Sequence, residues 1–174
     1  AVLPVGGAML LVAVLAHRTA VAQEPTAARL GRGQPQEVRD AIERVRTATE
    51  RFKDLDSAIA AGYARDVPRC LASPDGGMGF HHVKRELVDK TVELERPEIL
   101  LFERLEDGRY VLNGVEYIIP YTRWPSDSTP PTLLGRELLP ADNLRLWYLH
   151  MWVWRENKAG LFADWNPAVK CRTG

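Results

Sequence analysis

The sequence predicts an α+β fold, with N-terminal helices packed on a curled antiparallel sheet. Apolar residues recur with a helical period near the N-terminus, and extended apolar segments dominate after residue 80. The composition, 45% hydrophobic and 26% charged, is that of an ordinary globular protein. At 174 residues, one domain is expected.

The N-terminal segment, residues 1–22, is predicted to be a signal peptide. Residues 8–16 form an apolar run too short to span a bilayer, and Ala-Val-Ala at 20–22 is a typical cleavage signal. A membrane anchor or a buried helix is the alternative. We therefore expect a secreted or periplasmic protein with no membrane span in its mature chain. Residues 23–35 have the composition of a flexible linker, which leaves a single domain at 36–174.

Two helices are predicted at the start of the domain. Residues 36–53 have an amphipathic pattern, and Asp54 is placed to cap a second helix at 55–61. Residues 63–79 are rich in turn-forming residues and predict an irregular loop, followed by a short extended segment at 80–83.

The clearest strands form a hairpin. Residues 99–104 and 110–120 are extended in pattern, and Glu-Asp-Gly at 106–108 predicts the turn between them. A long proline-rich crossing, residues 121–143, is typical of a lid or binding loop. Residues 144–155, LRLWYLHMWVWR, then predict a central strand that is covered on both faces.

This order of elements resembles the cone-shaped fold of nuclear transport factor 2-like domains, in which the sheet curls around a pocket. A small β-barrel of the cupin type is the other expectation. In both folds, strands would supply the residues of a site.

Cys70 and Cys171 are the only cysteines of the chain. In an exported protein an even count favours a disulfide, which would tie the C-terminus to the first loop of the domain. A pair of metal ligands is the alternative, but no Cys-x-x-Cys motif supports it.

The formal net charge is zero, so the basic surface that nucleic-acid binding requires is not expected. A small-molecule ligand is compatible with this composition. The sequence does not determine the oligomeric state.

A metal site is predicted from His81, Glu116 and His150. Glu116 and His150 lie within apolar strands, where a charge is costly unless it is paired or bound to metal. Two histidines and one carboxylate suit a divalent transition metal, namely Zn, Fe, Mn or Cu. His82 follows His81 directly, and successive side chains of an extended segment oppose one another, so only one of them can face the site.

Aromatic residues and one further carboxylate complete the predicted pocket. The walls are expected from Tyr117, Tyr148, Trp152 and Trp154, and Asp164 is a fourth ligand or an outer partner. The alternatives are a core histidine at 150 and a Glu116 that faces solvent or pairs with Arg123 or Arg145.

Several blocks of the chain resemble an uncharacterised family of secreted bacterial proteins. The blocks are GGMGFHHV, RPEILLFE, GVEYIIP, LWYLHMWVW and FADWNPAVKC, and they match the family pattern GGMGxH, PExLLY, VEY, LHxWxW and WNPxVxC. The resemblance covers about residues 55–171 and implies that His81, Glu116 and His150 are motif positions. His82 departs from it, because an aromatic residue is expected there.

Three functions are compatible with these patterns. The first is an exported metal-binding protein, catalytic or not, with a His/Glu/His site in an aromatic pocket. The second is a non-catalytic binding module that holds an apolar small molecule or a partner segment. The third is a structural protein in which the same residues form a buried polar network.

Overall fold

The computed structural model describes residues 24–66 and 68–172, so the predicted signal peptide lies outside the described residues. Within these residues, seven strands form one antiparallel sheet, in the order β1-β3-β4-β5-β9-β8 with β2 paired to β3, and β6 and β7 form a separate pair. The helices are α1 (Ala27–Leu30), α2 (Gln36–Thr49), η1 (Glu50–Lys53), α3 (Leu55–Ala60) and η2 (Arg85–Leu87). The strands are β1 (Ala64–Arg65), β2 (Leu71–Ser73), β3 (Gly76–Val83), β4 (Ile99–Arg104), β5 (Tyr110–Pro120), β6 (Thr132–Leu133), β7 (Arg136–Glu137), β8 (Leu139–Ala141) and β9 (Leu146–Met151).

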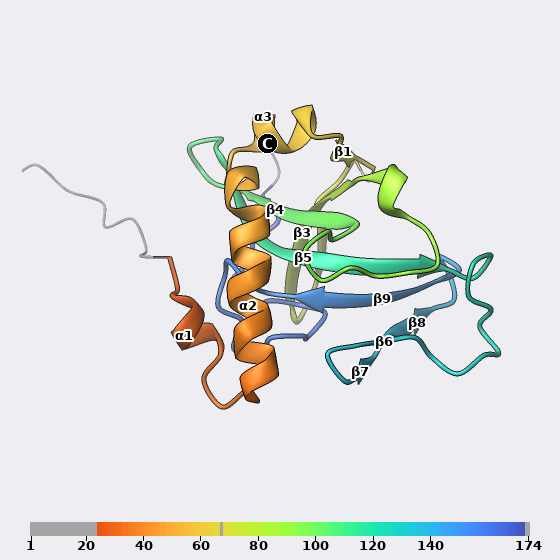
Figure 1. Cartoon of the computed structure of the whole chain (residues 1–174). Helices are drawn as coiled ribbons and strands as arrows, with labels where there is room; N and C mark the ends of the chain where they lie inside the picture. The colour runs from red at the N-terminus through yellow and green to blue at the C-terminus, as the bar shows by residue number, and fades with distance from the viewer. Residues whose placement is uncertain (1–23, 67, 173–174) are drawn as a thin grey trace, which may run out of the picture.

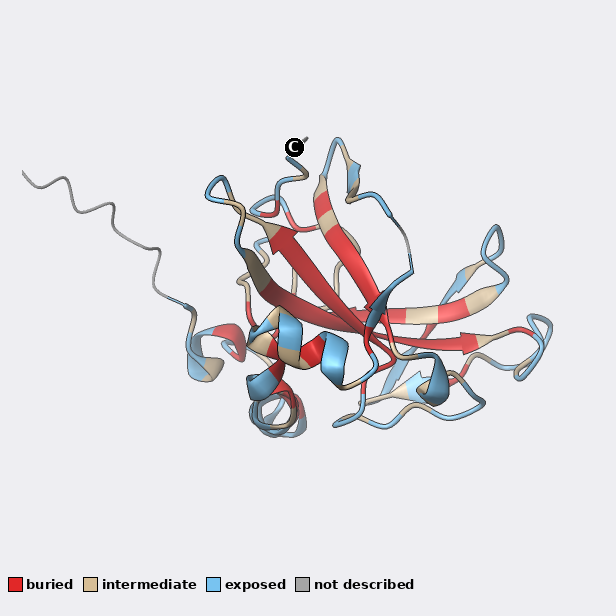
Figure 2. Ribbon diagram, turned by 90° about the horizontal axis from the view of Figure 1, so that it is seen from above, coloured by how far each residue is buried: buried red, intermediate tan, exposed pale blue. Residues whose placement is uncertain are grey.

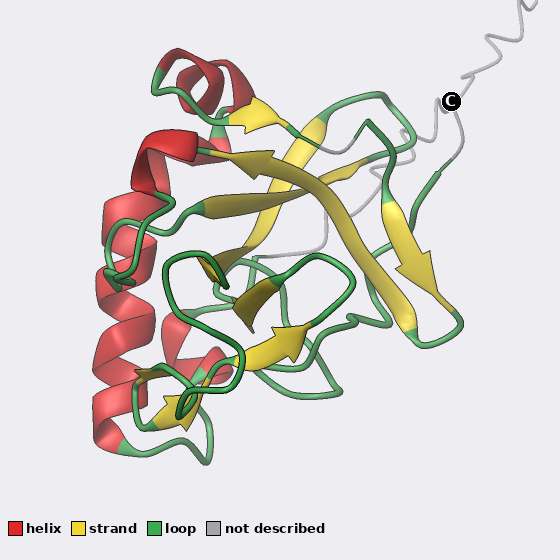
Figure 3. Cartoon of the chain, turned by 90° about the vertical axis from the view of Figure 1, so that its right-hand side faces the viewer, coloured by secondary structure: helices red, strands yellow, loops and turns green. Residues whose placement is uncertain are grey.

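The predicted fold class was wrong. The described chain is mostly antiparallel sheet with a few short helices, and the sheet path from β1 to β8 does not close into a barrel (Figures 1 and 3). The helices α1 and α3 each bury a single residue, Leu30 and Ala58. A layer of N-terminal helices over a curled sheet, as in a nuclear transport factor 2-like cone, is therefore not present in the described residues, nor is a cupin-like barrel. Short strands instead extend the sheet: β2 and β8 each pair with the strand that follows them, and β1 pairs with β3.

The local predictions for the longer elements are confirmed. The hairpin β4–β5 has the predicted bounds, and β9 lies between β5 and β8 in the interior of the sheet. The amphipathic segment forms α2 followed by η1, and the Asp54 carboxylate accepts a hydrogen bond from the Ser57 amide at the start of α3. The periodic spacing of apolar residues in each of these segments is sufficient to predict the element that it forms.

The Gly-rich segment predicted to be a loop is instead the first half of β3. A Cβ at Gly76 would lie 2.3 Å from the Asn166 carbonyl oxygen, and one at Gly79 would lie 2.3 Å from the Phe102 carbonyl oxygen. Both glycines also have positive φ angles, 140° and 94°. They allow neighbouring backbones to approach β3 closely, which is the reason that glycine suits this strand.

The central strands of the sheet are largely buried (Figure 2), and the two faces of the sheet contact different core clusters. One cluster combines the buried residues of α2 with Leu100 of β4 and with Val115 and Tyr117 of β5. The cluster on the opposite face contains Val83, Ile99, Leu101, Ile118, Trp152 and Val169. The site residues lie on this second face.

A bulge in the hairpin changes which side chains share a face. The register shifts so that Leu101 pairs with Gly114 but Phe102 pairs with Leu112, which leaves Asn113 without a partner in the ladder. Leu112 consequently joins the cluster of Val115 rather than the face of Glu116. Simple alternation along β5 would place Leu112 on the face of Glu116.

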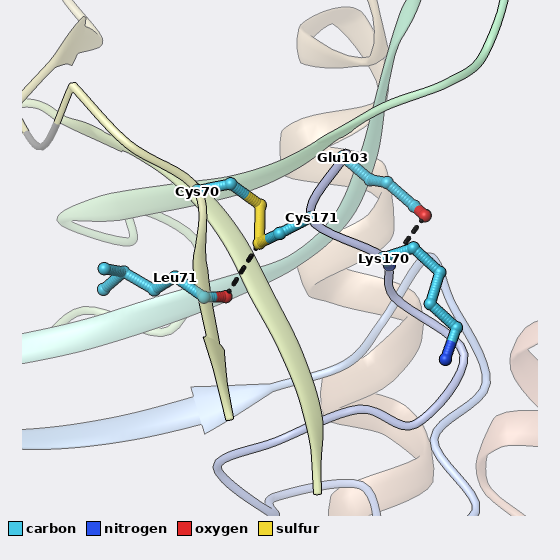
Figure 4. The surroundings of a disulfide bond; sticks show 5 residues. All are labelled: Cys70, Leu71, Glu103, Lys170 and Cys171. Carbon is cyan, nitrogen blue, oxygen red and sulfur yellow. Dashed lines mark hydrogen bonds between the residues drawn. A yellow bond between two sulfur atoms is a disulfide. The ribbon is translucent and has the colours of Figure 1, made fainter. Parts of the chain in front are cut away.

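The C-terminal segment, residues 161–172, crosses β3 and ends at the disulfide. Gly77 and Asn166 exchange two backbone hydrogen bonds, and Val169 belongs to the cluster on the site face. The predicted disulfide between Cys70 and Cys171 is confirmed, with 5.4 Å between the Cα atoms (Figure 4). Cys171 Sγ also lies 3.2 Å from the carbonyl oxygen of Leu71.

Two findings concern the ends of the domain. The segment predicted to be a linker contains α1, whose Leu30 side chain is buried in the larger core cluster. Among the residues that the structure describes, no helix has the length and apolar character that a membrane crossing requires.

Candidate metal centre

Three strands supply the predicted metal ligands. In the ladder between β5 and β9, Glu116 lies directly opposite His150. His81 lies on β3, on the far side of β4, where it pairs with Leu101. The side chain of His81 therefore reaches the other two from across an intervening strand, and all three project from the same face of the sheet.

The ligand atoms lie within metal-binding distance of one another. His81 Nε2 is 3.3 Å from Glu116 Oε2, and His150 Nε2 is 3.7 Å from the same oxygen. One ligand atom from each of the three residues can be chosen so that all lie within 4.8 Å. Two ligands bound tetrahedrally at about 2.1 Å from one ion are separated by about 3.4 Å. The observed separations are thus close to those that a bound ion imposes.

The three side chains are buried, and several of their polar atoms have no partner. His81, Glu116 and His150 are 6%, 7% and 1% exposed. Glu116 Oε2, both ring nitrogens of His150 and Nδ1 of His81 make no hydrogen bond. Buried polar groups without partners are costly, so most of those in native proteins are satisfied. A cation bound between Glu116 Oε2 and His150 Nε2 would satisfy both of these unpartnered atoms.

The electrostatic surroundings favour a charged carboxylate. Burial on its own raises the pKa of Glu116, but the facing imidazoles of His150 and His81 outweigh it and hold this pKa below its ordinary value. The carboxylate is therefore ionised at neutral pH, which is the state that binds a metal ion.

Asp164 approaches the site from the C-terminal segment. Its Oδ1 lies 3.6 Å from His150 Nδ1, on the side of the ring away from Glu116. Its Oδ2 accepts a hydrogen bond of 2.9 Å from the Tyr148 hydroxyl. Contact with His150 lowers the pKa of Asp164 despite the opposing effect of burial, and the Tyr148 hydroxyl adds to the lowering.

Two of the predicted wall residues also contact His150. The Tyr148 ring packs edge-on against the imidazole, with 5.4 Å between centroids, and Trp152 lies nearly parallel to it at 6.3 Å. Trp152 Nε1 donates to the carbonyl oxygen of Ala163, next to Asp164. These contacts place the imidazole among aromatic rings, as the aromatic residues around His150 in the sequence predicted.

Tyr117 and Trp154 lie away from the centre. Tyr117 points to the opposite face of β5, where its hydroxyl donates to the Leu94 carbonyl oxygen. Strand β9 ends at Met151, so strict alternation does not continue to Trp154, whose Nε1 donates to Thr49 of α2. The structure thus gathers Tyr148, Trp152 and Asp164 around His150 but not the other two pocket residues.

His82 also lies on the opposite face. Its ring packs edge-on against Phe102, and neither ring nitrogen has a hydrogen-bond partner. Burial, with a contribution from Arg65, lowers the pKa of His82 to about 4. Of the two adjacent histidines, His81 is therefore the one at the centre, as the sequence predicted.

Sequence reasoning missed the contacts that bring β9 and the C-terminal segment together. Gly114 has no local signal of a contact, but a Cβ there would lie 2.7 Å from the Met151 carbonyl oxygen. The glycine lets the end of β9 approach β5, next to His150. The hydrogen bond between Tyr148 and Asp164 had no signal in the sequence, because it joins a strand to a segment without regular structure.

Two cavities, of about 480 and 940 Å³, lie outside this centre. Trp152 lines the smaller one, and the larger runs between the β4–β5 turn and the C-terminal segment.

No protein family, curated protein or solved structure matches the chain. The function must therefore be inferred from the residues of the centre and their surroundings.

Proposed function

We propose that this chain is an exported metal-binding protein, in which His81, Glu116 and His150 bind one divalent transition-metal ion. The observation that carries the proposal is the convergence of three buried side chains, among which Glu116 Oε2 and the facing His150 Nε2 lack hydrogen-bond partners. The disulfide supports an oxidising compartment, in agreement with the predicted signal peptide.

The donor set narrows the metal by chemical type. Two imidazoles and a carboxylate suit Zn, Fe, Mn or Cu, and an oxygen-preferring ion such as Ca²⁺ would need more carboxylate or carbonyl ligands. Three protein ligands leave positions for water or a substrate, which is the arrangement of catalytic rather than structural zinc sites. A bound ion would supply Lewis acidity or an activated water there.

The residues around the ligands have separate tasks in this proposal. Glu116 supplies the only negative charge within the three-residue set, and the adjoining aromatic rings of Tyr148 and Trp152 shield the set from water. Low local polarity strengthens the attraction between Glu116 and a cation. We infer from the burial of the set that an ion exchanges slowly with solvent.

A purely structural role for the same residues is less well supported. A buried polar network stabilises a fold when each member has its partners, and here several atoms of the triad have none. A module for apolar ligands requires its aromatic residues in one cavity, whereas Trp147, Trp152 and Trp154 belong to three different core clusters.

Elemental analysis tests the proposal. The protein should be exported to a periplasm and purified without a His-tag or chelator, and we expect about one equivalent of a transition metal. Glu116→Gln and His81→Gln should abolish the bound metal. The matched controls are Glu98→Gln and His82→Gln, which change buried residues of the same types outside the triad and should leave the stoichiometry unchanged.

Melting temperature provides a second readout. An ion present at 100 times its Kd stabilises the folded state by about 2.7 kcal/mol. For a domain of this size that corresponds to a rise of about 5–10 °C. If the purified protein holds no metal and its melting temperature is unchanged by Zn, Cu, Mn and Fe(II), the proposed function is wrong.

A further inference from the structure

The carboxylate of Asp164 is held between two anchored parts of the C-terminal segment. On one side, the Ala163 carbonyl oxygen accepts a hydrogen bond of 2.6 Å from Trp152 Nε1. On the other, Asn166 exchanges backbone hydrogen bonds with Gly77 of β3. The Tyr148 hydroxyl holds one carboxylate oxygen, which leaves the other facing His150.

The geometry separates Asp164 from the ligands themselves. His150 presents Nε2 to Glu116 and Nδ1 to Asp164, so the two carboxylates lie at opposite nitrogens of one ring. The group whose ligand atoms all lie within 4.8 Å contains His81, Glu116 and His150 but not Asp164. Asp164 is also more accessible than the ligands, with a side chain 33% exposed.

We propose that Asp164 is a positioning residue of the metal site, which holds the proton of His150 on Nδ1 so that the Nε2 lone pair is free to bind the ion. This inference rests on the proposed function. A histidine that ligates a metal usually donates its other N–H to a carboxylate or carbonyl, which fixes the tautomer and makes the ligand more basic. The present 3.6 Å must shorten by about 0.5 Å for that hydrogen bond to form.

Tyr148 acts through Asp164 in the same arrangement. Its hydroxyl can donate to only one carboxylate oxygen, and this bond fixes the rotation of the carboxylate so that Oδ1 faces His150. Its ring packs against the same imidazole. The tyrosine thus contacts both members of the pair.

The structure offers a matched control for this pair. Tyr121 donates to Asp142 Oδ1 at 2.8 Å, which repeats the tyrosine–aspartate hydrogen bond at a place with no ligand of the triad. Asp142→Asn therefore shows how the loss of a tyrosine-bonded carboxylate affects the fold where no effect on the metal site is expected.

The experiment is a competition titration with Co²⁺ and Zn²⁺ on the full mature chain, combined with the visible absorption spectrum of the Co²⁺ form. We expect Asp164→Asn to weaken metal binding by roughly 10- to 100-fold. The stoichiometry and the Co²⁺ spectrum should remain those of the unmodified protein, and Asp142→Asn should leave Kd unchanged. Tyr148→Phe should weaken binding by a smaller factor, and it serves as the second variant if Asp164→Asn does not fold.

The possible results separate the two proposals. If the unmodified protein and Asp164→Asn bind the metal with the same Kd, the positioning role is overturned and the proposed function stands. A changed Co²⁺ spectrum in Asp164→Asn would make Asp164 a direct ligand and also overturn it. No binding by the unmodified protein would overturn both proposals.

Discussion

Replacing both Cys70 and Cys171 by alanine tests how strongly the disulfide stabilises the fold. The two residues are separated by 101 positions, so the bond closes most of the domain into one loop. For a loop of about 100 residues the chain-entropy model gives about 4.7 kcal/mol at 25 °C. Since domains are typically stable by about 5–15 kcal/mol, the variant should be folded but close to marginal stability.

The fold itself should survive this change. Two backbone hydrogen bonds between Gly77 and Asn166 and the burial of Val169 hold the C-terminal segment to the sheet independently of the sulfur atoms. The loss of free energy should therefore come mainly from the unfolded state, which gains freedom when the loop is opened. Near-UV circular dichroism should be the same for the variant and the unmodified protein.

Urea unfolding in the presence of EDTA measures the effect without a contribution from bound metal. With a slope of about 2 kcal/mol/M, the midpoint should fall by about 2 M. The unmodified protein treated with a reductant should unfold at the same midpoint as the variant, which controls for the alanine side chains. A loss of less than about 1 kcal/mol, at an unchanged slope, would refute the entropic reasoning.

Two further predictions concern the fold around the centre. Gly79→Ala should lower the free energy of unfolding by roughly 3 kcal/mol or more, because its Cβ would meet the Phe102 carbonyl oxygen at 2.3 Å and its φ is 94°. The control is Gly135→Ala, because Gly135 has a φ of 68° but nothing lies within 4 Å of its Cβ position. This variant should lower the free energy of unfolding by only about 1–2 kcal/mol, measured by urea unfolding. Equal losses of free energy in the two variants would contradict the argument. Burial raises the pKa of Glu98 to about 8 from 4.5, so the folded state binds more protons than the unfolded state between these values, and stability falls as pH rises through this range. Glu98→Gln should remove this pH dependence. The free energy of unfolding of the variant, measured relative to that of the unmodified protein, should therefore rise from pH 5 to pH 8 by a few kcal/mol at most. A difference in free energy that stays constant over this range would show that Glu98 is ionised in the folded protein.

The sequence was informative wherever a short segment carries its own pattern. The apolar period of 36–53 and the alternation in the hairpin identified these elements and their bounds closely, whereas β9, predicted at 144–155, is the shorter Leu146–Met151. The disulfide followed from the number of cysteines and the expected compartment. Glu116 and His150 were identified because polar residues in apolar strands are costly without a partner.

Local sequence patterns did not predict the fold class correctly. The strands β1, β2 and β8 have two or three residues each, too few to display a periodic pattern of their own, and they are defined by their pairing with β3 or β9. The glycines of β3 read locally as a loop, and only the approach of the C-terminal segment and β4 explains them. Pairing between distant segments depends on the whole arrangement of the sheet, and local propensity does not encode it.

Polar residues within apolar strands pointed to Glu116 and His150 in the sequence, and the family resemblance favoured His81 over His82. Tertiary structure alone decided that His150 lies opposite Glu116 and that Asp164 arrives at the second nitrogen, and it placed the expected His81 on the same face. It also placed Leu112 on the other face through the bulge. The physical reason is that a shift of one residue in strand register reverses every side chain, and register is set by contacts between strands far apart in the chain.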